Sequence, residues 1–131
     1  MVAVRKLAAS PLATVLLTED DPDIRQLIST FLRDLGYRVL AAADAEEALR
    51  LFDAHREIAL LLTDVTLPGG TTGFGLARQA HRRRPATKVI YASGHMRGDD
   101  WPGRDQLLGP LLMKPFRLAE LQRHVQAALS R

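Results

Sequence analysis

A chain of 131 residues, 47% of them hydrophobic and 25% charged, fits a single globular domain that can bury a sizeable core. The chain has no cysteine, which excludes disulfides and thiolate metal sites and leads us to expect a cytoplasmic location. No apolar run approaches the ~20 residues of a membrane-spanning helix, so we expect no membrane partner. We predict a flexible tail over residues 1–12 and one domain over residues 13–131.

The first predicted elements are a strand, a helix and a second strand. The strand runs from Ala13 to Thr18. A helix follows at Pro22, because proline is favoured in a first turn and Asp21 is a typical N-cap residue. Apolar residues then recur at helical spacing as far as Gly36, which ends the helix. The second strand is predicted over Tyr37–Ala42.

The middle of the chain repeats this alternation. Asp44, with Glu47 three residues later, resembles a capping box and predicts the start of a second helix. The third strand, Ile58–Thr63, is the most continuously apolar segment. A third helix around Phe74 ends before Pro85, because proline and the residue before it disfavour helix.

The last part contains two more strands and a final helix. We predict strands over Lys88–Ala92 and Leu111–Met113, and a helix over Leu118–Leu129. Glycine and proline interrupt residues 96–110 repeatedly, so a fourth helix in this segment is short or distorted. Short apolar strands that alternate with amphipathic helices indicate one α/β domain of the (βα)5 type with a parallel sheet.

Polar side chains stand at the carboxyl ends of four predicted strands: Glu19 and Asp20, Asp64, Ser93, and Lys114. The strand ends of a parallel sheet share one edge, so these side chains can converge despite their separation in sequence. Asp64 is the most informative, because an unpaired carboxylate is costly to bury and rarely follows an apolar run without a reason.

The residue types at these strand ends are chemically coherent. Clustered carboxylates are the hard oxygen ligands that suit Mg²⁺. A carboxylate can also act as a nucleophile that becomes an aspartyl phosphate. A lysine and a hydroxyl then hold the phosphoryl oxygens, because phosphoryl transfer depends mainly on positioning and on charge neutralisation.

With these residues in view, the chain from Thr14 to Leu129 resembles the receiver domain of two-component response regulators. The resemblance depends on four segments in this order: Leu16–Arg25, Leu62–Pro68, Ala92–Gly94 and Lys114–Phe116. It implies a doubly wound parallel five-stranded sheet of flavodoxin-like order 2-1-3-4-5. The pattern is similar to receivers of hybrid histidine kinases and to stand-alone single-domain regulators.

The resemblance also implies a magnesium-dependent phosphoacceptor site. Asp64 is the implied phosphoacceptor and a metal ligand, and Asp20 is a direct Mg²⁺ ligand. Glu19 acts on the ion through water, and the backbone carbonyl of Thr66 completes the protein's ligands.

Three further positions take family roles under the resemblance. Ser93 supplies the switch hydroxyl, and Lys114 contacts the phosphoryl group. Under the same resemblance, the peptide bond between Lys114 and Pro115 is cis. His95 lies two residues beyond Ser93, at a position that the family uses to modulate access to the site.

The chain departs from the family's usual pattern in three places. The loop after Pro68 is one residue longer than usual and lacks the usual acid. Leu111 stands three residues before Lys114, where the family usually has a switch aromatic, which places coupling of Ser93 to an aromatic rotamer in question. The third departure is the poorly helical segment 96–110, because the family commonly uses that region for output.

Together these features predict a receiver that accepts a phosphoryl group on Asp64 from a histidine kinase or phosphotransfer protein. It is not a conventional enzyme: the expected chemistry is magnesium-dependent self-phosphorylation and slow autodephosphorylation. We expect no output domain in these residues, so signalling goes through contact with a downstream protein target, unless the chain was cut from a larger protein.

Other interpretations stay open at this point. The acids after the first strand could serve only as helix caps, Ser93 as a turn serine, and Lys114 as a surface lysine. A phosphorylation-independent adaptor is the main functional alternative. A flavodoxin-like ligand or redox domain would need a hydroxyl-rich phosphate loop after the first strand, which is absent.

Nucleic acid binding is a further alternative, which we disfavour. The net charge is only +3, and the densest basic stretch is residues 81–84, His-Arg-Arg-Arg. We interpret this stretch as the solvated end of a helix, where cations complement the helix dipole. No aromatic residues interleave with it and no recognition-helix motif is present, so we expect no direct nucleic-acid partner.

Overall fold

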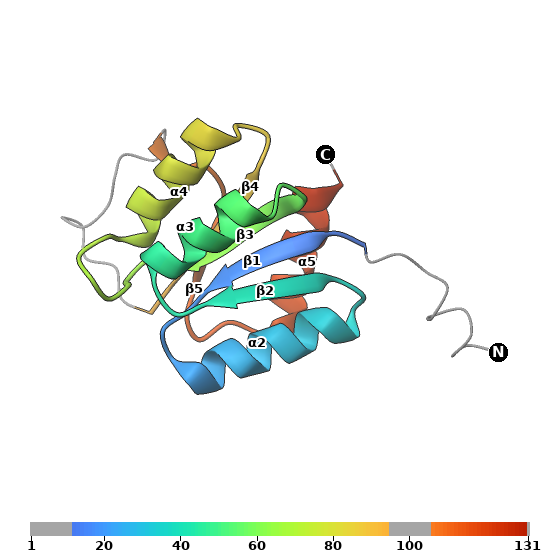
Figure 1. Cartoon of the computed structure of the whole chain (residues 1–131). Helices are drawn as coiled ribbons and strands as arrows, with labels where there is room; N and C mark the ends of the chain where they lie inside the picture. The colour runs from blue at the N-terminus through green and yellow to red at the C-terminus, as the bar shows by residue number, and fades with distance from the viewer. Residues whose placement is uncertain (1–11, 95–105, 131) are drawn as a thin grey trace.

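The computed structural model describes residues 12–94 and 106–130, which form a parallel sheet covered by helices on both faces (Figure 1). The five strands are β1 (Thr14–Thr18), β2 (Arg38–Ala42), β3 (Ile58–Asp64), β4 (Lys88–Ser93) and β5 (Leu111–Met113). Their order is β2-β1-β3-β4-β5, and every neighbouring pair is parallel. The predicted doubly wound sheet and its order are confirmed.

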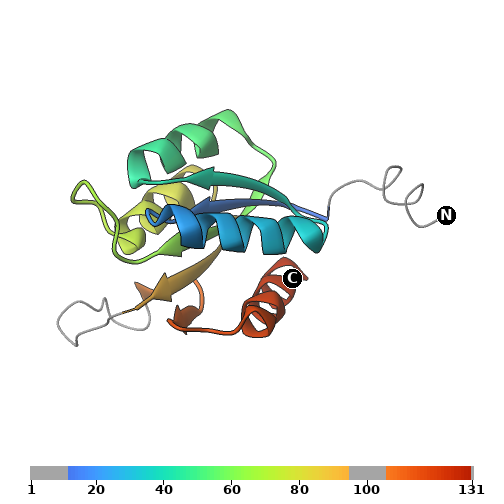
Figure 2. The ribbon, with the colours of Figure 1, turned by 90° about the horizontal axis from the view of Figure 1, so that it is seen from below.

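The helices divide between the two faces of the sheet. They are α2 (Pro22–Asp34), α3 (Ala45–Ala54), α4 (Gly73–Arg83) and α5 (Leu118–Leu129). One buried cluster joins α3 and α4 to the sheet, and the other joins α2 and α5 to the opposite face. Figure 2 shows the same division, with α5 on the opposite side of the sheet from α3. Strands covered on both faces explain why β1 is buried throughout and β3 almost throughout.

Side-chain caps start the helices where the sequence predicts them. The Asp21 carboxylate accepts hydrogen bonds from the backbone N–H groups of Asp23 and Ile24. Asp44 caps α3 by accepting from the Glu47 N–H at 2.8 Å. The Glu47 carboxylate accepts from the N–H of Ala43 at 2.7 Å, one residue before the cap, so the reciprocal bond of a capping box is displaced by one position.

The segment before β5 is fixed tightly against β4. The Tyr91 hydroxyl accepts a hydrogen bond from the Leu108 N–H at 3.3 Å, and the Tyr91 N–H donates to the Pro110 carbonyl at 2.9 Å. A side chain at Gly109 would collide with the carbonyl oxygen of Val89, so only glycine allows this approach. Most of the predicted distorted fourth helix, and His95, lie outside the described residues.

The structure also bears on the membrane question. Among the described residues, no helix combines the length and the apolar character that a membrane crossing needs.

Candidate functional site

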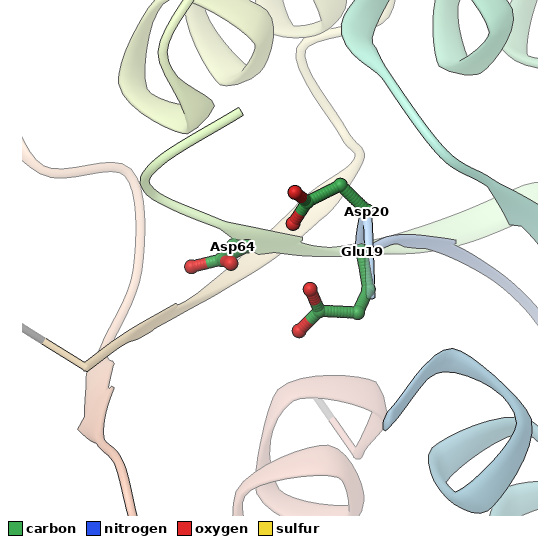
Figure 3. A group of neighbouring side chains, drawn as sticks. All are labelled: Glu19, Asp20 and Asp64. Atoms are coloured by element: carbon green, nitrogen blue, oxygen red, sulfur yellow. The ribbon is translucent and has the colours of Figure 1, made fainter. Parts of the chain in front are cut away.

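Strand register brings the predicted acids together at the carboxyl edge of the sheet. Thr18 of β1 is paired with Thr63 of β3, so the residues that follow them, Glu19 and Asp64, emerge side by side. One carboxylate oxygen from each of Glu19, Asp20 and Asp64 lies within 4.8 Å of the others. Figure 3 shows these three side chains at the neighbouring ends of β1 and β3. We call this group the acidic cluster.

Lys114 joins the acidic cluster from the end of β5. Its Nζ donates to Glu19 Oε1 at 2.8 Å and to Asp64 Oδ2 at 3.3 Å. The backbone N–H of Lys114 donates to the carbonyl of Ser93 at 2.8 Å, which extends the β4–β5 pairing by one residue. The bond from Lys114 to Pro115 is cis, as predicted.

Glu19 is the most enclosed member of the acidic cluster, with only 3% of its surface exposed. Both of its carboxylate oxygens have partners, because Oε1 binds Lys114 and Oε2 accepts from the Asp21 N–H at 3.2 Å. Asp20 is exposed, and Asp64 is partly buried. The cluster therefore has one acid with both oxygens engaged, one with a single oxygen bound to Lys114, and one, Asp20, that is exposed.

The close approach of these charged groups and their burial shift the pKa values of Glu19 and Lys114. Burial raises the pKa of Glu19, and the nearby charge of Asp64 adds to the rise, although hydrogen bonds from Lys114 and the Asp21 N–H oppose it. Burial lowers the pKa of Lys114, but its hydrogen bonds to Glu19 and the charges of both acids outweigh burial, and the pKa is raised. Lys114 is therefore a cation at neutral pH.

The acidic cluster is chemically suited to a divalent cation. It presents three carboxylates against one ammonium, and like charges this close repel one another. The donor atoms are all oxygens, and the exposure of Asp20 leaves space for the waters that Mg²⁺ retains. Charge and donor type thus fit the predicted ion.

The other two predicted positions, Ser93 and Thr66, lie next to the acidic cluster in strand pairing and in sequence. Ser93 ends β4 and is 1% exposed, and Ala92 before it is paired with Asp64 in the sheet. Thr66 is exposed in the turn two residues beyond Asp64. The roles of the Ser93 hydroxyl and of the Thr66 carbonyl stay predictions.

The sequence did not reveal the role of Arg25 in holding the acidic segment. Its Nη1 donates to the backbone carbonyl of Glu19 at 2.8 Å and to that of Asp20 at 3.3 Å. In the sequence Arg25 is only a cation on the polar side of an amphipathic helix. The one available signal was a basic residue in a segment that is otherwise acidic.

An apolar groove of about 430 Å³ lies beside Lys114. Its walls come from the start of α2 and from the segment between β5 and α5: Ile24, Leu27, Ile28, Gly94, Lys114, Pro115, Phe116 and Leu118. Helical spacing placed Leu27 with the apolar residues of α2, but its side chain is 56% exposed. Leu27 is therefore at the groove and outside the core.

The comparisons with known proteins agree with this geometry. The family model of the response regulator receiver domain matches residues 15–126, and the chain therefore belongs to that family. Receiver domains serve two-component signalling, generally bind Mg²⁺ at an acidic cluster, and interact with histidine kinases or phosphotransfer proteins and with downstream targets.

Individual relatives are 27% to 31% identical to this chain over the aligned residues. A probable transcriptional regulator, ycf27, of Cyanidium caldarium is 29% identical over 89% of the chain and 46% of its own length. A CheY-like receiver domain protein from Methanospirillum hungatei is 27% identical, with a TM-score of 0.83 over 90% of this chain and 94% of that one. The receiver domain of the hybrid histidine kinase CckA is 31% identical, with a TM-score of 0.75 over 89% of this chain and 99% of that one. The chain spans about half the length of the first curated relatives it matches.

Proposed function

We propose that this receiver domain accepts a phosphoryl group on Asp64 from the phosphohistidine of a histidine kinase or phosphotransfer protein. A carboxylate oxygen of Asp64 attacks phosphorus in line with the bond to the imidazole nitrogen. The new P–O bond forms as the P–N bond breaks, and the histidine nitrogen keeps the electron pair. The observation that carries the proposal is the placement of Asp64 between Lys114 and two other carboxylates.

Charge at the site supports this chemistry. We propose that Asp20 and Asp64 hold Mg²⁺ directly, Glu19 through water, and the Thr66 carbonyl as a further ligand. When bound, the ion neutralises charge on the phosphoryl oxygens. Lys114 is anchored by Glu19 and supplies a second positive charge to the phosphoryl oxygens. The Ser93 hydroxyl binds a phosphoryl oxygen of the product and passes the change to its loop.

The apolar groove supports a protein as the phosphodonor. It runs from Lys114 to the exposed Leu27, so it adjoins the acidic cluster. A helix that carries the phosphohistidine can bury its apolar side chains there while the imidazole reaches Asp64. We therefore place the phosphodonor on this groove.

The proposal is tested by incubation with a small phosphodonor and Mg²⁺. We expect an acid-stable, base-labile adduct in the wild type and none in Asp64→Ala. Asp44→Ala is the matched control, because Asp44 is another aspartate after a strand but caps α3 through the Glu47 N–H. Labelling that persists in Asp64→Ala contradicts the assignment. Absence of labelling in the wild type favours a phosphorylation-independent adaptor.

A further inference from the structure

Arg25 holds the backbone that carries two acids of the acidic cluster. The residue lies in the first turns of α2, and its own N–H donates to the Asp21 carbonyl at 2.9 Å. Its side chain turns back over the start of the helix, and Nη1 donates to the carbonyls of Glu19 and Asp20 at 2.8 and 3.3 Å. One guanidinium thus contacts two consecutive peptide groups between β1 and α2.

The hydrogen-bond partners of the Arg25 side chain indicate its role. A cation near a helix N-terminus is disfavoured by the helix dipole, and four carboxylates stand nearby in the sequence, at positions 19, 20, 21 and 23. Within residues 12–94 and 106–130, however, Arg25 appears in no ion pair and in two hydrogen bonds to carbonyl oxygens. The guanidinium binds the main chain and forms no ion pair with these carboxylates.

The same segment is held from a second direction. The Glu19 N–H donates to the carbonyl of Ala42 at the end of β2, at 3.0 Å. The Glu19 residue is therefore fixed on its amide side by β2 and on its carbonyl side by Arg25. A rotation of the peptide after Glu19 would re-aim both carboxylates, and the Arg25 bonds oppose that rotation.

We propose that Arg25 is a positioning residue, which locks the Glu19 and Asp20 carbonyls so that both carboxylates point at Asp64. The inference rests on the proposed function, because it assigns Arg25 to the same metal-dependent site. Residues that orient ligands from behind typically change metal affinity by tenfold or more when they are lost.

A purely electrostatic role makes the opposite prediction. If Arg25 acted only as a positive charge near the cluster, it would weaken cation binding, and its removal would tighten the binding of Mg²⁺. If it positions the ligands, its removal weakens that binding. The sign of the change separates the two roles.

The first test is a calorimetric titration with Mg²⁺. We expect Arg25→Ala to bind Mg²⁺ about tenfold more weakly than the wild type. Arg25→Lys should lie between them, because an ammonium keeps the charge but does not reproduce the planar guanidinium. Labelling by the small phosphodonor should fall at low Mg²⁺ and recover at saturating Mg²⁺. Arg33→Ala is the matched control, because Arg33 donates from the other end of α2 to the Val39 carbonyl at 3.0 Å, away from the cluster.

A second readout needs no metal. The Asp21 N–H donates to Glu19 Oε2, so its hydrogen exchange in EDTA reports the position of the Glu19 side chain. We expect faster exchange at Asp21 in both Arg25 variants and no change in Arg33→Ala. Unchanged or tighter Mg²⁺ binding, or unchanged exchange at Asp21, overturns the positioning role. A wild type that binds no Mg²⁺ contradicts the proposed function instead, and the exchange experiment still decides the role of Arg25.

Discussion

Two glutamates at opposite edges of the sheet have pKa values that are shifted in opposite directions. Glu57 lies just before β3, at the amino edge, where it is exposed and meets Arg38 at 3.0 Å and His55 at 3.4 Å. A hydrogen bond from its own backbone lowers the pKa of Glu57, and His55 and Arg38 lower it further. Glu19 follows β1 at the carboxyl edge, where burial raises its pKa. Solvent access and the number of available cations therefore decide the behaviour of the same side chain.

The contrast extends to the neighbours of each glutamate. At the amino edge, Asp53 also has its own cation, because Arg83 lies 3.5 Å away at a partly exposed position. Such exposed pairs contribute little to stability. At the carboxyl edge, two acids of the cluster, Glu19 and Asp64, share Lys114, and the third, Asp20, lies beside them. This excess of negative charge is the reason we propose the carboxyl edge as the site for a cation and a phosphoryl group.

Removal of Lys114 should have the largest effect on stability. Lys114→Met leaves Glu19 and Asp64 without their cation in a partly buried site, and we expect the free energy of unfolding in EDTA to fall by about 2 kcal/mol. Arg83→Met at the amino edge should cause a much smaller loss. Urea unfolding at neutral pH measures both, and equal losses would remove the distinction between the edges.

Removal of one acid should have the reverse effect. Asp20→Asn relieves repulsion within the acidic cluster, so we expect the metal-free protein to gain about 1 kcal/mol of stability. The same variant should lose most of the stabilisation that Mg²⁺ gives to the wild type. Thermal unfolding with and without Mg²⁺ measures both effects. If the variant is less stable than the wild type in EDTA, or keeps the full response to Mg²⁺, Asp20 neither repels the other acids of the cluster nor binds the ion.

The smallest expected effect is on the pH dependence of stability in EDTA. The folded pKa of Glu19 is raised, so its contribution is fully present below the ordinary value of 4.5 and is lost as pH rises through the folded pKa. The folded pKa of Glu57 is lowered, so its contribution is present above 4.5 and is lost as pH falls.

Unfolding free energies measured from about pH 3 to about pH 7 in Glu19→Gln and Glu57→Gln therefore deviate from the wild type with opposite slopes. Relative to the wild type, Glu19→Gln should gain stability as pH rises through this range, and Glu57→Gln should lose it. Slopes of the same sign would mean that the pKa values of Glu19 and Glu57 are not shifted in opposite directions.

Much of the fold could be predicted from local sequence patterns. The strand from Leu111 to Met113 and the helix from Leu118 to Leu129 have the predicted bounds, because apolar runs and helical periodicity are local properties. The grouping of Glu19, Asp20 and Asp64 was also predictable, because parallel strands end at a common edge.

Contacts between distant side chains were not predictable in the same way. The division of Lys114 between Glu19 and Asp64 depends on side-chain geometry across three strands. The hydroxyl of Tyr91 is a similar case. Tyr91 is paired in the sheet with Leu111, and its hydroxyl accepts a hydrogen bond from the Leu108 N–H. Nothing in the local pattern of β4 indicated that bond.

The most direct test of the central claim is to locate the phosphoryl group. After labelling by a small phosphodonor with Mg²⁺, peptide mass spectrometry should find the mass of one phosphoryl group on the segment that contains Asp64 and on no other segment. Label on Asp20, Glu19 or a hydroxyl residue, or an unlabelled Asp64 segment in a labelled protein, would contradict the assignment of Asp64 as the phosphoacceptor.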